Sequence, residues 1–147
     1  MGNSFSVQLT GAKELVQAIQ KHTQQEARAD LRVASRAAMK PVQDRARAAA
    51  KAFDDPDTPV AVWKNIATRA KWDRKEQAQI TSVGVQGGAR YRGGEPTQAA
   101  PFHWRFRELG TEHQPARPFL RPALENHAQE VLAELVSTLR VRLQKRQ

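Results

Sequence analysis

The apolar residues of the N-terminal half recur at the spacing of helices. Leu15, Val16 and Ile19 predict a helix over residues 12–22. A longer helix is predicted over residues 24–53, where most residues of the apolar stripe are alanine. This stripe consists of Leu31, Ala34, Ala38, Val42, Ala46, Ala49 and Phe53. Small side chains let another element approach closely, so this face suits tight packing.

Two signals within this second helix concern its start and its continuity. Thr23 is followed three residues later by Glu26, the spacing of a capping box, so the helix is expected to begin directly after Thr23. Pro41 lies inside the helix and is expected to kink or split it, because proline cannot donate the helical hydrogen bond.

Alternation of apolar and polar residues predicts four strands. A short strand is expected at 5–9, and a hairpin is expected from strands 60–70 and 78–85 around the charged turn 71–76. The clearest alternation is at 102–109. There Phe102, Trp104 and Phe106 would face one way and His103, Arg105 and Arg107 the other.

The C-terminal segment predicts one long helix. Pro122 suits its first position, and an apolar stripe runs from Leu124 to Leu143, so about 24 residues would form a helix of roughly 36 Å. The predicted fold is therefore α+β and a single domain over 1–147. An antiparallel sheet of about four strands would carry the long Ala-rich helix and the long C-terminal helix on one face.

Composition narrows the possible chemistry. The chain has 147 residues and no cysteine, which excludes thiolate nucleophiles, zinc–thiolate sites and disulfides. It has 24 Lys and Arg against 15 Asp and Glu, a net charge of +9, which favours contact with polyanions. Neither a secretion signal nor a membrane-spanning run is recognisable, so a cytoplasm-like compartment is expected.

A glycine-rich stretch interrupts the predicted strands. Residues 84–101 hold five of the eight glycines, and Arg90, Tyr91 and Arg92 lie between them. This composition predicts a flexible loop that faces DNA or a protein partner. A phosphate-binding loop is not indicated, because no Gly-Lys-Ser/Thr follows.

Catalytic signals are weak. The four histidines (His22, His103, His113 and His127) have no metal-ligand spacing, and the sequence predicts no metal and no cofactor. The strongest enzymatic interpretation is a small basic ribonuclease with His103, Arg105 and Arg107 on one sheet face and Lys64 or Arg69 nearby. The plainer interpretation is a solvated sheet face. Trp63, Trp72 and Trp104 could stack bases, although core or interface positions suit them better.

Residues 104–123 carry a longer pattern. Trp104-Arg105-Phe106-Arg107-Glu108-Leu109-Gly110-Thr111 is followed by Pro115-Ala116-Arg117-Pro118-Phe119-Leu120-Arg121-Pro122-Ala123. This run resembles the neck and tail-completion family of long-tailed bacteriophages, the small head–tail joining proteins related to minor tail protein Z. The layout upstream is also similar, with one departure: Asp57-Thr58-Pro59 stands where many members have a Thr-Gly turn.

The resemblance implies a structural virion protein rather than an enzyme. Such a protein forms a ring around the DNA channel at the head–tail junction, after assembly in the host cytoplasm. Its partners would be further copies of itself, head-closure or connector proteins, and tail-tube or tail-terminator proteins. Contact with genomic double-stranded DNA would be weak and transient, and no membrane is involved.

A closed ring, expected to be six-fold to match a tail tube, needs two different patches on each subunit. The helix 24–53 and the C-terminal helix are the candidate patches. The alternatives are a tail terminator capping the tube, a toxin-like ribonuclease and a non-specific DNA-binding protein.

Physical roles can be assigned within the motif. Gly110 permits a turn with positive φ, and Glu108 is expected to pair with Arg117 or Arg121 because an unpaired buried carboxylate is costly. Phe119 and Leu120, on a proline-stiffened segment, are candidate anchors for the core or an adjacent subunit. The predicted structural and interface residues are Glu108, Gly110, Thr111, Arg117, Pro118, Phe119, Leu120, Arg121 and Pro122.

Overall fold

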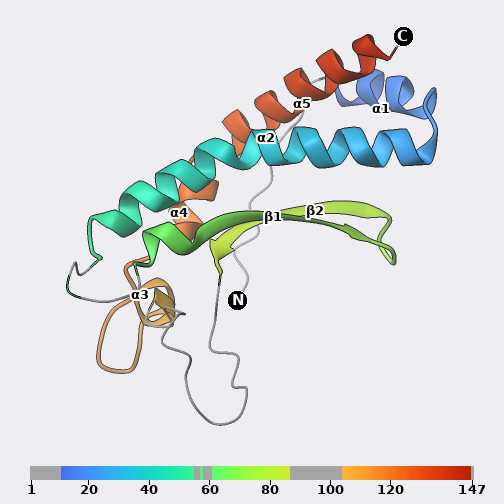
Figure 1. Ribbon diagram of the computed structural model, residues 1–147. Helices are drawn as coiled ribbons and strands as arrows, with labels where there is room; N and C mark the ends of the chain where they lie inside the picture. Colours follow the sequence, from blue (N-terminus) through green and yellow to red (C-terminus); the bar gives the residue numbers. More distant parts are fainter. Residues whose placement is uncertain (1–10, 55–56, 58–60, 87–103, 147) are drawn as a thin grey trace. The chain divides into compact units, whose positions relative to one another are not determined.

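The computed structural model describes residues 11–54, 57, 61–86 and 104–146 (Figure 1). These residues form an α+β structure with one two-stranded antiparallel sheet. The helices are α1 (Ala12–Gln20), α2 (Gln24–Lys51), α3 (Trp104–Leu109), α4 (Leu120–Glu125) and α5 (Ala128–Lys145). The strands are β1 (Ile66–Asp73) and β2 (Ala78–Val85), and the short 3-10 helix η1 (Trp63–Asn65) precedes β1.

The prediction of about four strands is therefore wrong. The hairpin is confirmed, and β2 has the predicted bounds. β1 begins later than expected, at Ile66, because the residues before it form η1, and it continues to Asp73, three residues into the predicted turn 71–76. The strand predicted at 5–9 lies outside the described residues, as does most of the glycine-rich segment 84–101, with Arg90, Tyr91 and Arg92.

The strand predicted at 102–109 is also wrong, because its described part is the helix α3. Strand alternation needs a neighbouring strand to pair with, and the described sheet holds only β1 and β2. Over only six residues, the two-residue period of a strand and the 3.6-residue period of a helix cannot be told apart clearly. Phe106 and Leu109, three residues apart on one side of this helix, are 48% and 72% exposed.

The single C-terminal helix is wrong as well, because Asn126 and His127 separate α4 from α5. Asn126 still has helical dihedral angles, but His127 leaves the helical region at φ −130° and ψ 13°. Asparagine and histidine have low helix propensity, so the helix is interrupted at these two residues. The apolar stripe in the sequence continues past them and gives no sign of this break. Pro122 is the third residue of α4 rather than the first, within the turn whose N–H groups lack helical partners.

The chain divides into two compact units. The first contains residues 1–41, 69–82 and 127–147, and the second contains residues 42–68 and 83–126. α2 and both strands each contribute residues to both units. The single-domain expectation stays a prediction.

The core of the first unit is where α1, α2 and α5 meet. Leu15, Ala34, Val136, Leu139 and Leu143 form its buried cluster. Ala34 is fully buried, so the alanine stripe of α2 brings its backbone close to the leucines of α5. In this unit α2 lies between α5 and the hairpin (Figure 1). The hairpin is fixed to α2 by a hydrogen bond of 2.8 Å from the Thr81 hydroxyl to the Ser35 hydroxyl.

The capping box is confirmed. The Glu26 backbone N–H donates to Thr23 Oγ1 at 3.3 Å, and the Thr23 N–H donates to Glu26 Oε2 at 3.1 Å. Glu26 Oε2 accepts hydrogen bonds from the Thr23 hydroxyl and from the Thr23 N–H, and these two bonds, the first above all, lower the pKa of Glu26. Pro41 does not split α2, which is helical throughout its length. Ala38 and Val42, on either side of it, are both buried, so packing holds the helix across the missing hydrogen bond.

The second unit packs the C-terminal part of α2 against the start of β1. Ala46 and Ala50 of α2 are fully buried, whereas Ala49 of the predicted stripe is exposed. The carbonyl oxygen of Ile66 accepts hydrogen bonds from Gln43 Nε2 at 3.1 Å and from Arg47 Nη2 at 2.8 Å. Two polar side chains of α2 thus fix the first residue of β1. None of the helices described here is long and apolar enough to cross a membrane.

Candidate functional site

The predicted structural and interface residues of the motif come together in the second unit, at a corner formed by α3, the loop 110–118 and α4. We call this the α3–α4 corner. Glu108 is its centre. Its carboxylate accepts hydrogen bonds from the backbone N–H groups of Phe119 at 2.8 Å, Leu120 at 3.0 Å and Arg121 at 3.0 Å. These groups lie at the N-terminus of α4, where helical N–H groups lack partners and the dipole favours negative charge. Glu108 therefore caps α4 from another helix.

The arginine partner expected for Glu108 is therefore wrong. Three N–H groups satisfy the carboxylate, and no side chain of Arg117 or Arg121 pairs with it in the described structure. Arg121 Nε instead lies 3.7 Å from Glu125 Oε1 in an exposed i, i+4 pair, which contributes little to stability. Arg117 joins the corner through its backbone, whose N–H donates to the Arg107 carbonyl oxygen at 2.7 Å.

Gly110 ends α3, and its predicted positive φ is confirmed at +75°. Its N–H donates to the Phe106 carbonyl oxygen at 2.9 Å, the bond of a left-handed helix C-cap. A Cβ at this position would lie 2.8 Å from the backbone nitrogen of Ala116. Both the dihedral angle and the space therefore require glycine.

Thr111 forms the turn after Gly110. Its Oγ1 accepts hydrogen bonds from the backbone N–H groups of His113 and Gln114, and its own N–H donates to the Gln114 carbonyl oxygen at 2.9 Å. The turn sends the chain back toward α3, so Thr111 acts within the chain. Pro118 is exposed, and Pro122 lies within α4.

Three side chains stack where the corner meets the turn that follows α2. The Arg107 guanidinium lies 4.0 Å from the centroid of the Phe53 ring. Phe53 meets Phe119 edge to face, with 5.1 Å between the ring centroids. Phe119 is only 4% exposed, so it is a core anchor of this unit, while Leu120 is half-buried.

The capping role of Glu108 gives a first prediction. Replacing Glu108 with Ala leaves three N–H groups of α4 without their acceptor, so the free energy of unfolding is expected to fall by about 2 kcal/mol. Denaturant titration followed by circular dichroism measures this change. Glu112→Ala is the matched control, because Glu112 is exposed in the same loop, and it is expected to change stability by less than about 0.5 kcal/mol. Equal stability of the two variants would contradict the capping role.

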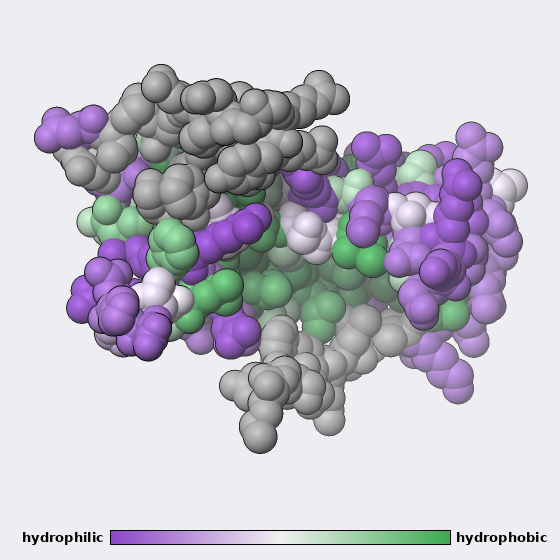
Figure 2. All heavy atoms as spheres, turned by 90° about the horizontal axis from the view of Figure 1, so that it is seen from below, coloured by the Kyte–Doolittle hydropathy of each residue, from purple (hydrophilic) through white to green (hydrophobic). Residues whose placement is uncertain are grey.

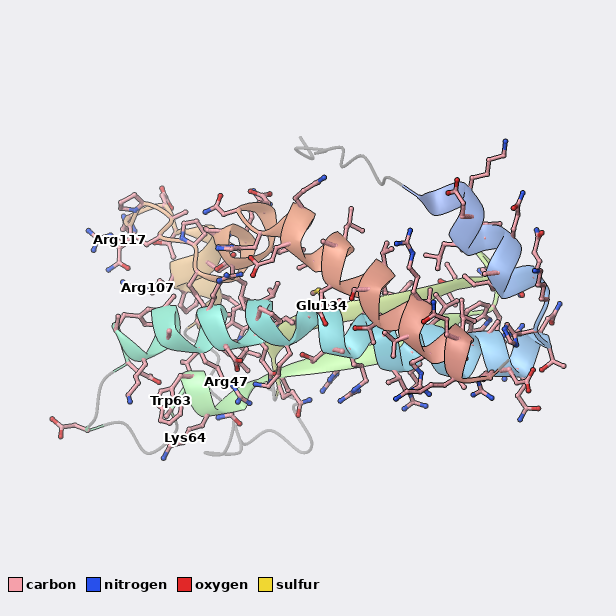
Figure 3. The ribbon with its side chains drawn as sticks, turned by 90° about the horizontal axis from the view of Figure 1, so that it is seen from above. Arg47, Trp63, Lys64, Arg107, Arg117 and Glu134 are labelled. Carbon is pink, nitrogen blue, oxygen red and sulfur yellow. The ribbon has the colours of Figure 1, made fainter. Side chains whose placement is uncertain are left out.

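Two described residues of the ribonuclease interpretation, Lys64 and Arg107, do not meet in the second unit. Lys64 and Arg107 lie on opposite flanks of the C-terminal half of α2 (Figure 3). The Arg107 guanidinium is already stacked on Phe53, and the Arg105 guanidinium lies 5.6 Å from the ring centroid of Trp104. His103 lies outside the described residues. Among the described residues there is no group of three or more His, Cys, Asp or Glu side chains that could hold a metal.

An ion-pair cluster in the first unit was missed by the sequence analysis. Asp30 of α2 is fully buried, and it accepts hydrogen bonds from Arg142 Nε at 2.8 Å and Arg146 Nε at 2.7 Å. Burial raises the pKa of Asp30, but the hydrogen bonds from Arg146 and Arg142 outweigh this effect and lower the pKa overall. The sequence did contain a signal for this cluster. Asp30 lies four residues before Ala34 and eight before Ala38, so a charged residue occupies a position on the buried face of α2 and needs a partner there.

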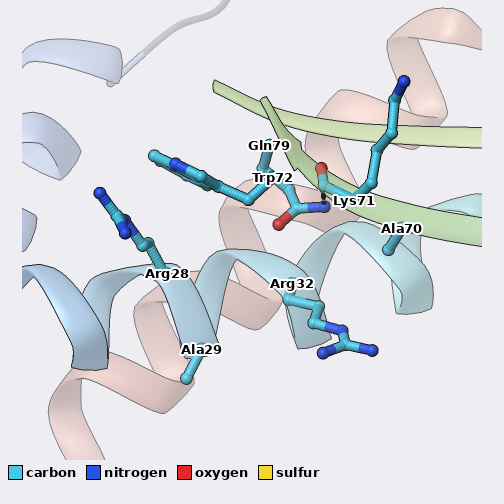
Figure 4. Close-up of a pocket in the computed structure, with 7 residues that line it drawn as sticks. All are labelled: Arg28, Ala29, Arg32, Ala70, Lys71, Trp72 and Gln79. Atoms are coloured by element: carbon cyan, nitrogen blue, oxygen red, sulfur yellow. Dashed lines mark hydrogen bonds between the residues drawn. The ribbon is translucent and has the colours of Figure 1, made fainter. Parts of the chain in front are cut away.

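A basic hollow in the same unit was also missed. α2 and the hairpin border an open hollow of about 310 Å³, whose lining residues include Arg28 and Arg32 from α2 and Trp72 and Gln79 from the strands (Figure 4). The Arg28 guanidinium lies 4.4 Å from the ring centroid of Trp72. The Gln79 amide donates to the Lys71 carbonyl oxygen at 3.0 Å.

Comparison of the chain with protein-family models, with curated protein sequences and with solved structures gives no match.

Proposed function

We propose that this chain is a structural subunit of the head–tail junction of a tailed bacteriophage. In this role it forms a ring around the DNA channel and joins head to tail. The observation that carries the proposal is the α3–α4 corner, because the residues behind the resemblance to neck and tail-completion proteins also build this part of the fold. Glu108, Gly110, Thr111 and Phe119 each have a structural contact there.

The corner also supports an interface role. Glu108, Gly110 and Thr111 use their polar groups within the chain, whereas Leu109, the last residue of α3, is 72% exposed. An exposed leucine on a helix that Glu108 and Gly110 hold rigidly loses little entropy when a partner covers it. The partner that the proposal requires is a second copy, which meets α3 with a different patch of its own.

The interface patches expected from the sequence need revision. The apolar faces of α2 and α5 pack against each other within the first unit, through Ala34, Leu139 and Leu143. These faces are therefore filled inside one subunit. We place one side of the subunit interface at α3 instead.

The proposal predicts a closed ring of purified protein. Native mass spectrometry should show a discrete oligomer, and six times the chain mass of 16.5 kDa gives about 99 kDa. A monomer that degrades RNA, with activity lost in His103→Ala, would contradict the proposal.

The proposed place of the interface is tested separately. Leu109→Gln removes an apolar side chain whose burial contributes about 1.5–2 kcal/mol, so ring formation should need at least about tenfold more protein. Val141→Gln is the matched control, because Val141 is a 47% exposed apolar residue on α5. Dilution series by mass photometry measure both. If Val141→Gln weakened the ring and Leu109→Gln did not, the interface would lie on α5 and not on α3.

A further inference from the structure

We propose that the basic flank of α2 in the first unit, made of Arg28, Arg32 and Arg36 beside the basic hollow, binds the phosphate backbone of double-stranded DNA. This inference rests on the proposed function, because a subunit around the DNA channel would meet double-stranded DNA as its polyanion. The sequence predicts that the loop with Arg90, Tyr91 and Arg92 faces DNA or a protein partner, whereas we place the DNA contact on α2.

The first support is the distribution of charge. The first unit holds 14 Lys and Arg against seven Asp and Glu, a formal charge of +7 out of the chain's +9. The second unit holds ten against eight, which leaves +2. In this unit, hydrophilic side chains cover the hairpin tip and the N-terminal end of α2 (purple, right-hand side of Figure 2).

The second support is that these cations are not neutralised within the chain. Arg142 and Arg146 are used by Asp30, but no carboxylate of the described residues lies within 4.0 Å of Arg28, Arg32 or Arg36. Arg32 and Arg36 are exposed. Guanidinium groups on a rigid helix, with no internal acid, are available to bind phosphate.

The third support is spacing. The three arginines are four residues apart on α2, so they follow one flank of the helix with about 6 Å between successive residues. A line of charges about 12 Å long spans three to four phosphates of one DNA strand along the duplex axis, at about 3.4 Å for each phosphate, and its three guanidinium groups can contact up to three of them. A line of this kind fits an extended polyanion better than a small anion.

The hollow gives the line a place where a phosphate can approach closely. Its volume of about 310 Å³ beside Arg28 and Arg32 leaves room for the non-bridging oxygens of one phosphate group. Arg28 is held by its stack on Trp72 and by a hydrogen bond of 3.2 Å from Nη2 to Gln77 Oε1. Its guanidinium is therefore fixed before a phosphate arrives.

Duplex DNA fits this surface better than a single strand. Proteins that bind single strands stack the bases on exposed aromatic rings. Trp72, the tryptophan of this unit, is half-buried and has the Arg28 guanidinium over one face. The surface therefore offers charge without a free stacking platform. Contact by charge alone is weak and salt-sensitive, as suits DNA that must slide past.

The test is binding of purified full-length protein to a random-sequence 30-base-pair duplex, measured by fluorescence anisotropy from about 50 to 200 mM salt. Arg32→Gln/Arg36→Gln should weaken binding about tenfold at 50 mM salt. It should also make the slope of log K against log salt less steep by about two, since each lost phosphate contact removes about 0.9. Arg32→Lys/Arg36→Lys keeps the charge and should bind within about threefold of the native chain.

The matched control is Lys13→Gln/Lys21→Gln, which removes the same charge from exposed positions of the first unit away from this flank. It should bind within about threefold of the native chain. An equal loss in both Gln variants, or no binding of the native chain at 50 mM salt, would overturn the inference. Tenfold tighter binding to the single strand, or equally tight binding to polyglutamate, would also overturn it, the latter in favour of an acidic protein partner. Ring formation is measured independently by native mass spectrometry. A failure of the proposed DNA contact can therefore be distinguished from a failure of the proposed ring.

Discussion

Gly110→Ala is expected to lower the free energy of unfolding by about 3 kcal/mol or more. A left-handed conformation costs a residue with a Cβ about 1–2 kcal/mol, and here the Cβ would also lie 2.8 Å from the backbone nitrogen of Ala116. The loop 110–118 would have to move, and Glu108 would lose its alignment with α4. Chemical denaturation followed by far-ultraviolet circular dichroism measures the loss.

The chain provides a matched control for this variant. Gly84 lies in β2 without a positive φ, and a Cβ there would meet no described atom within 4 Å. Gly84→Ala is therefore expected to be neutral or to stabilise by about 0.5 kcal/mol, since alanine loses less conformational freedom on folding. If both variants lose the same stability, the geometry at Gly110 is not the cause.

Asp30→Asn should have the second large effect, a loss of about 2–3 kcal/mol at neutral pH. Removing one partner of a buried ion pair typically costs about 3–5 kcal/mol. The cost should be smaller here, because the Arg142 and Arg146 side chains are 35% exposed and can regain water. Glu14→Gln, at an exposed position of α1, is the control and should change stability by less than about 0.5 kcal/mol.

The same ion-pair cluster predicts a pH dependence. The pKa of Asp30 in the folded chain lies below its ordinary value of 3.8, so the folded state binds the proton more weakly than the unfolded state. The stabilisation is thus fully present above about pH 4 and is lost as the pH falls through the folded pKa. Unfolding measured between pH 2 and 7 should show a smaller acid loss for Asp30→Asn than for the native chain. Parallel pH profiles would contradict this role.

Features set by neighbouring residues could be predicted from the sequence. Thr23 and Glu26 form their capping box because both partners lie within one helical turn. β2 has its predicted bounds, and Gly110 has its predicted positive φ because the turn needs it locally. In each case the deciding interaction spans only a few residues.

Features set by distant residues could not be predicted in the same way. The alternation at 102–109 indicated a strand, but Phe53, two residues after the end of α2, stacks on Arg107, and the start of α4 binds Glu108. These contacts fix α3 as a helix, and no local pattern records them. Glu108 was identified as a buried charge that needs partners, yet backbone N–H groups of a helix that begins twelve residues later satisfy it.

Charge shows the same dependence on folding. Along the sequence, the excess of positive charge is greatest over residues 61–110, where the net charge is +5. In the folded chain, the first unit, which joins α1, α5 and most of α2, carries a net charge of +7. Asp30 and its two arginines are more than one hundred residues apart in sequence. Only the packing of α5 on α2 brings them together.

The central claim is that this chain is a structural part of a virion, and an electron cryomicroscopy map of assembled phage particles tests it most directly. The account predicts a ring of six copies at the head–tail junction, with α3 of each subunit against its neighbour. Particles that contain no copy of the chain, or density for it only away from the junction, would contradict the account.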